Sequence, residues 1–175
     1  MILTRNAHTL TEMLIVSFMA VVLFTSTIGV FVVTRTFYIR GIASQELQRD
    51  VNWLMARIVK GIEEGGVRYG LRSAESYTEP VTPITEINFT GTDGNARRYR
   101  LSSGSIIYES PTQTPNIQTI YTVPANSTLT LRFEKPTGYM DNETLAVYIG
   151  ITRQISGRTA SGSLTTYVNL RNVSK

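Results

Sequence analysis

The chain has 175 residues, of which 42% are hydrophobic and only 17% are charged, with a formal net charge of +4. This length allows one modest domain plus an anchor. The basic residues are scattered and form no run of the kind that binds nucleic acid, so no nucleic-acid partner is expected. The absence of cysteine excludes disulfides, thiolate zinc sites and thiol catalysis.

The first predicted element is a long apolar segment. Residues 13 to 34 contain no Asp, Glu, Lys or Arg, and a bilayer core is crossed by about 20 helical residues. A secretory signal peptide has an apolar region of about 7–15 residues followed by small residues, whereas TRTFYIR follows this segment. We therefore predict a transmembrane helix that stays attached to the chain. Arg5 on one flank and Arg35 and Arg40 on the other leave its orientation open.

A single carboxylate, Glu12, stands directly before this apolar segment. At the centre of a membrane helix a carboxylate costs roughly 2.5–3.5 kcal/mol, and less near the interface. Two interpretations are open. Glu12 is an interfacial side chain that reaches the lipid headgroups, or it pairs with a cation inside an assembly, such as the N-terminal ammonium of a neighbouring subunit. The second interpretation requires the chain to be cut just upstream of Glu12.

The residues around Glu12 form a recognisable signature. The stretch AHTLTEMLIV (residues 7–16) and the apolar run after it resemble the N-terminus of type IV pilins and type II secretion pseudopilins. That signature has a short polar leader, a cut after a small residue (usually Gly), an aromatic residue (usually Phe), and Thr-Leu-x-Glu before a long apolar run. Here Ala7 stands at the Gly position and His8 at the Phe position.

The resemblance implies maturation and assembly. A prepilin peptidase would cut between Ala7 and His8 and methylate the new amino group of His8. Glu12 would then neutralise the N-terminal amine of an adjoining subunit. The implied partners are the inner membrane, the prepilin peptidase and other pilin or pseudopilin subunits. The implied localisation is the bacterial inner membrane, crossed once, with the head in the periplasm and the subunit incorporated into a pilus or pseudopilus.

The sequence after the apolar segment predicts that the same helix continues, from about His8 to Ile62. Apolar residues recur at helical spacing and indicate a stripe that packs on a head domain; they are Leu47, Val51, Leu54, Met55, Ile58 and Ile62. Gly61, Gly65 and Gly66 predict its end, and at Gly41 we expect the helix to be able to kink or unwind. Trp53, the only tryptophan, is expected to be a packing residue.

The rest of the sequence predicts strands. The segments that alternate apolar and polar residues are 85–91, 97–103, 105–110, 127–135, 143–155 and 163–172. Asp93-Gly94 and Gly104 mark hairpin turns, residues 110–116 and 156–163 resemble loops, and the short links favour an antiparallel sheet. The predicted fold class is α+β, pilin-like: a long N-terminal helix, transmembrane in its first half and amphipathic in its second, packed on an antiparallel β-sheet head.

These elements predict four segments of the chain. They are a leader over residues 1–7, a transmembrane or filament-core helix over 8–34, an amphipathic continuation over 35–64, and a β-rich extracytoplasmic head over 65–175. The helix followed by a strand-rich half that ends in VNLRN looks most like minor subunits of the W and J types.

The sequence argues against an enzyme. His8 is the only histidine and lies in the N-terminal segment, so the head cannot hold a Ser-His-Asp triad or a histidine metal site. Glu63-Glu64 is expected at a solvated helix end, and Asp93 and residues 141–142 in turns. No spaced set of calcium ligands is visible. We therefore predict no catalytic residue, no metal site and no cofactor.

Three classes of function remain. The first is a structural subunit, of a minor kind, of a type IV pilus or a type II secretion pseudopilus, matured by cleavage after Ala7. The second is a single-pass, membrane-anchored extracytoplasmic binding or adhesion module that does not polymerise. The third, a membrane-tethered hydrolase, is disfavoured by the single histidine.

Overall fold

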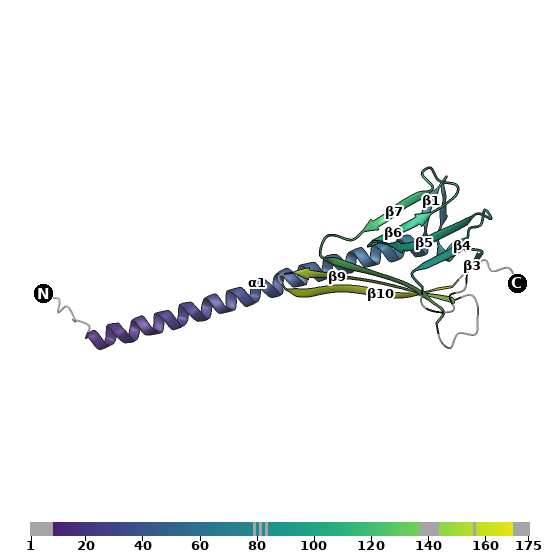
Figure 1. Cartoon of the computed structure of the whole chain (residues 1–175). Coiled ribbons are helices and arrows are strands. Elements are labelled where there is room, and N and C mark those ends of the chain that lie inside the picture. Colours follow the sequence, from purple (N-terminus) through teal and green to yellow (C-terminus); the bar gives the residue numbers. More distant parts are fainter. Residues whose placement is uncertain are drawn as a thin grey trace. The chain divides into compact units, whose positions relative to one another are not determined.

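A computed structural model describes residues 9–78, 80, 82, 84–136, 144–155 and 157–169. It divides the chain into two units, Met1–Ile42 and Ala43–Lys175. Helix α1, Leu10–Lys60, contributes its first part to one unit and its last part to the other. All the strands belong to the second unit (Figure 1).

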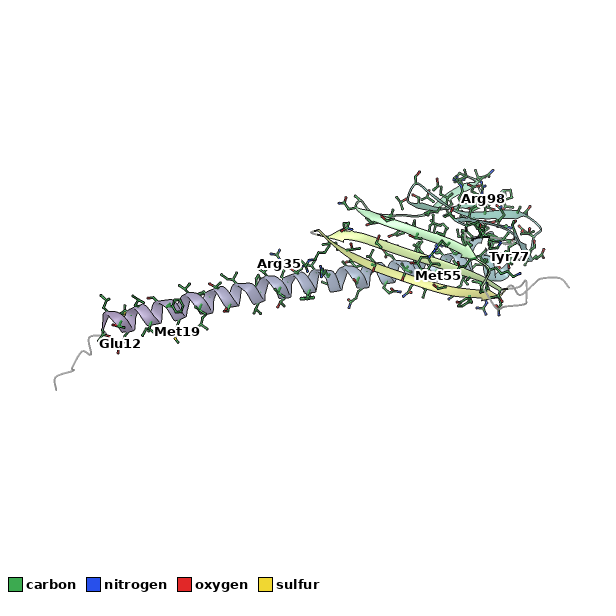
Figure 2. All side chains as sticks on the ribbon, turned by 60° about the horizontal axis from the view of Figure 1, so that its bottom comes forward. Glu12, Met19, Arg35, Met55, Tyr77 and Arg98 are labelled. Carbon is green, nitrogen blue, oxygen red and sulfur yellow. The ribbon has the colours of Figure 1, made fainter. Side chains whose placement is uncertain are left out.

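The first part of α1 is apolar around its whole circumference. Large apolar side chains between Leu10 and Ile42 are exposed, among them Phe18 and Phe31, and Figure 2 shows Met19 projecting outward from the helix. The helix is long and apolar enough to cross a membrane. The expected long N-terminal apolar helix is therefore confirmed.

Five hydroxyl groups in this apolar part bond within the helix. Each donates a hydrogen bond of 2.8 Å to the carbonyl four residues earlier; they are Ser17, Thr25, Ser26, Thr27 and Thr36. Because lipid offers no hydrogen-bond partner, polar groups on such a helix have to be satisfied internally. These side chains therefore suit an apolar environment.

The last part of α1 packs on the head through the predicted stripe. The helix residues buried there are Ala43, Leu47, Val51, Leu54, Met55 and Ile58; Met55 is labelled in Figure 2. Gly61 has a φ of +92°, and its N–H donates to the carbonyl of Arg57 at 3.0 Å. This left-handed residue ends the helix at Lys60.

The predicted helix end at Ile62 is therefore wrong by two residues. Ile62–Glu64 forms strand β1, which pairs antiparallel with β2, Val67–Tyr69. Gly65 and Gly66, at φ +57° and +86°, make the two-residue turn between them, as such hairpins require. Residues 61–64, assigned above to the amphipathic helix, thus belong to the strand-rich part.

Two further sheets complete the second unit, and all pairings in them are antiparallel. One has the order β3-β4-β5-β6-β7 and the other the order β10-β9-β8. Their strands are β3 Ser76–Tyr77, β4 Glu86–Thr90, β5 Ala96–Ser102, β6 Ser105–Glu109, β7 Ile117–Thr122, β8 Ser127–Glu134, β9 Thr144–Ile155 and β10 Arg158–Asn169, and a short 3-10 helix, η1 Leu71–Ser73, precedes β3. The α+β class is confirmed, and the described residues of the head form three sheets where one was expected.

The predicted turns are confirmed. Gly94, at φ +74°, lies in the turn between β4 and β5, and Ser103 and Gly104, at φ 47° and 75°, form the turn between β5 and β6. Residues 110–116 contain no strand, as expected. Strand β10, in contrast, begins at Arg158 inside the predicted 156–163 loop.

Two sheets and the helix share one core. It includes the helix stripe together with Ile87 and Tyr99 from the five-stranded sheet and Val147 and Ile149 from the three-stranded sheet. An isolated antiparallel bridge between Ile84 and Phe133 joins the two sheets. Tyr77, at the edge of the five-stranded sheet (Figure 2), packs against the same core.

Trp53 differs from its prediction. Its side chain is 45% exposed, and the guanidinium carbon of Arg57 lies 5.2 Å from the centre of its ring. Trp53, expected to be a packing residue, therefore lies at the helix surface, where the guanidinium of Arg57 covers part of its ring.

Candidate functional site

The N-terminus of α1 is closed by two reciprocal hydrogen bonds. The backbone N–H of Thr9 donates to Glu12 Oε2 at 2.8 Å, and the backbone N–H of Glu12 donates to Thr9 Oγ1 at 3.3 Å. This pair is a capping box, which satisfies two of the helix's terminal N–H groups. The carboxylate also lies in the first turn (Figure 2), where the helix dipole favours negative charge.

The cap bears on both interpretations of Glu12. Ala7 and His8, the predicted cleavage and methylation residues, lie outside the described residues. The two hydrogen bonds use only Thr9 and Glu12, so a cut between Ala7 and His8 would leave both partners in the mature chain. Glu12 therefore has a local role in helix formation, and that role is compatible with cleavage.

The helix surface that follows Glu12 exposes many large apolar side chains. Leu14, Val16, Phe18 and Leu23 are each more than 60% exposed. Soluble monomers rarely expose contiguous apolar surface of more than a few hundred Å². This part of α1 therefore requires lipid or other protein chains around it.

The head contains a cluster of charged side chains, centred on Arg97 of β5. The Arg97 side chain is fully buried. Its Nη1 and Nη2 donate to the two carboxylate oxygens of Asp93 at 2.6 and 2.8 Å, and Nη2 also donates to Glu64 Oε2 at 2.9 Å. The guanidinium carbon lies 3.6 Å from the ring centre of Tyr69. A buried arginine is thus held by two carboxylates and one aromatic face.

Glu64, at the end of β1, accepts further hydrogen bonds. Tyr108 donates to Oε1 at 2.6 Å, and Thr112 and Ser110 donate to Oε2 at 2.6 and 3.2 Å. Burial opposes the charged form, but the hydrogen bonds from Arg97, Thr112 and Tyr108 outweigh it and lower the pKa of Glu64. The prediction that Glu64 lies at a solvated helix end is wrong, whereas Glu63 is exposed as expected.

The same contacts keep Asp93 and Arg97 charged. The hydrogen bonds from Arg97 dominate and lower the pKa of Asp93 well below its usual range. Burial works against the guanidinium, but Asp93 and Glu64 outweigh it and raise the pKa of Arg97. The network joins β1, the β4–β5 turn, β6 and the loop after β6. Because its side chains stay charged at neutral pH, the network favours a structural role over proton transfer.

No metal centre is formed by the described residues. Among them, no group of three or more His, Cys, Asp or Glu side chains could hold a metal ion. The predicted turn residues Asp141 and Asn142 lie outside the described ranges.

The fold and these sites define the class of protein, an α+β protein with a long apolar N-terminal helix. Comparison of the chain with family models, with curated proteins and with solved structures gave no significant match. Any narrower assignment therefore depends on the sequence signature and on the geometry described above.

Proposed function

We propose that the protein is a minor structural subunit of a type IV pilus or a type II secretion pseudopilus. In this proposal a prepilin peptidase cleaves between Ala7 and His8 and methylates His8. The mature helix stays in the bacterial inner membrane, with the head outside the cytoplasm, until it enters a filament. Its partners are the peptidase and other subunits of the same family.

The observation that carries the proposal is a carboxylate in the first turn of a helix whose following residues, 13–34, carry no charge. Glu12 lies in the first turn of α1, and the surface after it is exposed and apolar. In a filament that apolar surface is covered by the helices of other subunits. An opposite charge about 4 Å from Glu12 contributes about 4 kcal/mol at an effective dielectric near 20, so an ammonium of an adjoining subunit fixes where subunits join.

The alternative is a membrane-anchored binding module that does not polymerise. It is favoured by the capping box, because Thr9 and Glu12 stabilise the helix start without any second subunit. In this case the apolar surface of α1 is covered by lipid alone.

The substitution Glu12→Gln separates the two functions, because glutamine keeps the cap and removes the charge. The filament proposal predicts that Glu12→Gln and Glu12→Ala both insert normally in the membrane and both fail to enter filaments. The measurement is the amount of each variant in sheared or purified filaments, compared with its amount in membranes.

Thr9→Val is the matched control, since it removes the hydroxyl of the cap but leaves the carboxylate. It should enter filaments with at most a modest loss. If Glu12→Gln is incorporated as well as the unsubstituted chain, the charge has no role in assembly and the anchored module is the better description.

A further inference from the structure

Two adjoining cavities lie on the second unit beside the end of α1, and the larger one borders Glu64 and Thr112 of the Arg97 network. One, of about 520 Å³, includes Arg57, Glu63, Thr114 and Gln118 in its lining. The other, of about 280 Å³, includes Trp53, Arg57, Glu63 and Arg68. Because they share Arg57 and Glu63, we treat them as one site, the Arg57 groove, with Lys60 also in its lining.

The Arg57 groove contains polar atoms without partners. Within the described part of the chain, Arg57 Nε and Gln118 Oε1 are buried and have no hydrogen-bond partner. Burying an unpaired polar group costs free energy, of the order of 1–3 kcal/mol. Both residues line the larger cavity, so a ligand that carries both acceptors and donors would reduce this cost through small side-chain shifts.

The charge of the groove favours an anionic ligand. Arg57, Lys60 and Arg68 contribute positive charge, of which Glu63 opposes a part through its ion pair with Arg68 at 3.7 Å. Glu64 also borders the larger cavity, but its carboxylate already accepts hydrogen bonds from Arg97 and Thr112. Arginine binds carboxylates with charge-assisted hydrogen bonds and, unlike lysine, in a two-pronged geometry.

The chemical character of the lining favours a saccharide over a peptide. Peptide recognition depends mainly on apolar or aromatic anchors held in pockets, and the larger cavity is lined mostly by hydroxyl, amide and charged side chains. Trp53 is 45% exposed, and the part of its ring that the Arg57 guanidinium does not cover suits contact with the C–H face of a sugar ring. Amide and hydroxyl groups such as Gln118 and Thr114 suit sugar hydroxyls, each of which both donates and accepts.

We propose that the Arg57 groove binds an acidic saccharide, with the carboxylate of a hexuronic acid on Arg57, the sugar ring against Trp53 and its hydroxyls towards Gln118. This interaction does not depend on the filament proposal, because every residue in it belongs to the second unit. It gives the head a ligand whether or not the chain polymerises.

Trp53 also provides the readout, because it is the only tryptophan in the chain. The full chain in detergent micelles is titrated with an oligogalacturonate trimer while the tryptophan fluorescence is followed. We expect a saturable change. The fully methyl-esterified trimer, which has the same rings and no charge, should give no saturable change.

Substitutions then assign the contacts, with binding measured by calorimetry. Arg57→Gln should weaken binding of the trimer by about tenfold or more, as expected when one charge-assisted hydrogen-bonded pair is lost. Gln118→Ala and Trp53→Ala should each weaken it as well. Arg49→Gln is the matched control, because Arg49 is an exposed arginine of the same helix that lines neither cavity, and it should leave the affinity unchanged.

Three results would overturn the proposal: no saturable response from the unsubstituted chain, equal affinity for the esterified trimer, or unchanged affinity in a folded Arg57→Gln variant. A triglutamate peptide is titrated in parallel. Equal or tighter binding of that peptide would replace the acidic saccharide with an acidic polypeptide as the ligand.

Discussion

At the residue scale, the largest difference between sequence and structure is Glu64. The sequence placed it at a solvated helix end, yet it accepts hydrogen bonds from Arg97, Tyr108 and Thr112. Local spacing could not reveal this, because the donors lie on strands and a loop distant in sequence. The burial of Arg97 was easier to predict, because the alternation within 96–102 puts Arg97 on the same face of the strand as the buried Tyr99.

The Arg97 network makes a pH-dependent contribution to stability. The pKa values of Glu64 and Asp93 lie below their ordinary values of 4.5 and 3.8. Groups with lowered folded-state pKa values stabilise the fold above those ordinary values, and the contribution is lost as the pH falls through the lowered ones. Unfolding of the head should therefore become easier below about pH 4.

Arg97→Met tests this network. It leaves the buried carboxylate of Glu64 and the partly exposed carboxylate of Asp93 without their cation, so the free energy of unfolding should fall by about 3–5 kcal/mol at pH 7. The variant should also lose less stability on acidification, because the pKa values of its Glu64 and Asp93 are no longer lowered by hydrogen bonds from Arg97. Denaturant titrations at pH 7 and pH 3.5, for both chains, measure these effects. An equal acid-induced loss in both chains would contradict the role given to Arg97.

At the scale of elements, the sequence predicted α1, β4, β5, β6, β8 and β9 and the turns at Gly94 and Gly104. It missed the short strands β1, β2 and β3 as well as β7, which follows the loop-like TQTPN, and it began β10 too late. The Ser, Thr and Gly residues at the start of β10 lack an apolar pattern, and they form a strand through backbone pairing with β9, from Arg158↔Ile155 onward. Pairing of this kind depends on a partner strand, which no local pattern contains.

Gly162 shows how closely β10 approaches the helix within the second unit. A Cβ atom at Gly162 would lie 2.8 Å from the backbone nitrogen of Gln48 and 2.9 Å from the carbonyl carbon of Leu47. Both neighbours are backbone atoms and cannot rotate away. Gly162→Ala should therefore lower the free energy of unfolding by about 1–3 kcal/mol, measured by denaturant titration.

Gly41 provides the comparison for Gly162. A Cβ atom there meets nothing within 4 Å, and alanine favours a helix by about 1 kcal/mol over glycine. Gly41→Ala should leave the stability of the head unchanged. If Gly162→Ala changed the free energy of unfolding as little as Gly41→Ala does, that result would contradict the close contact between β10 and α1.

At the scale of the whole molecule, the chain combines an apolar helix surface with a head that has its own core. The first unit, Met1–Ile42, contains no buried apolar side chain among its described residues, whereas the second, Ala43–Lys175, contains the whole core. Composition predicted an apolar helix followed by a strand-rich head, but the boundary between the units falls inside the segment 35–64, which was expected to be one amphipathic helix. The burial of particular head residues could not be predicted in the same way.

A fragment of residues 43–175 should therefore be soluble and monomeric, because it keeps the core and lacks the exposed apolar surface. The full chain should need detergent or lipid. Light scattering coupled to size-exclusion chromatography measures both. Strong self-association of the fragment would show that the head carries an assembly surface of its own.

The most direct test of the account is the N-terminal mass of the protein isolated from a cell with an active prepilin peptidase. The account predicts a mature chain that starts at His8, with one added methyl group on its amino nitrogen, and no leader residues Met1–Ala7. An intact chain that still begins at Met1 would contradict it and would leave the protein as a membrane-anchored α+β module.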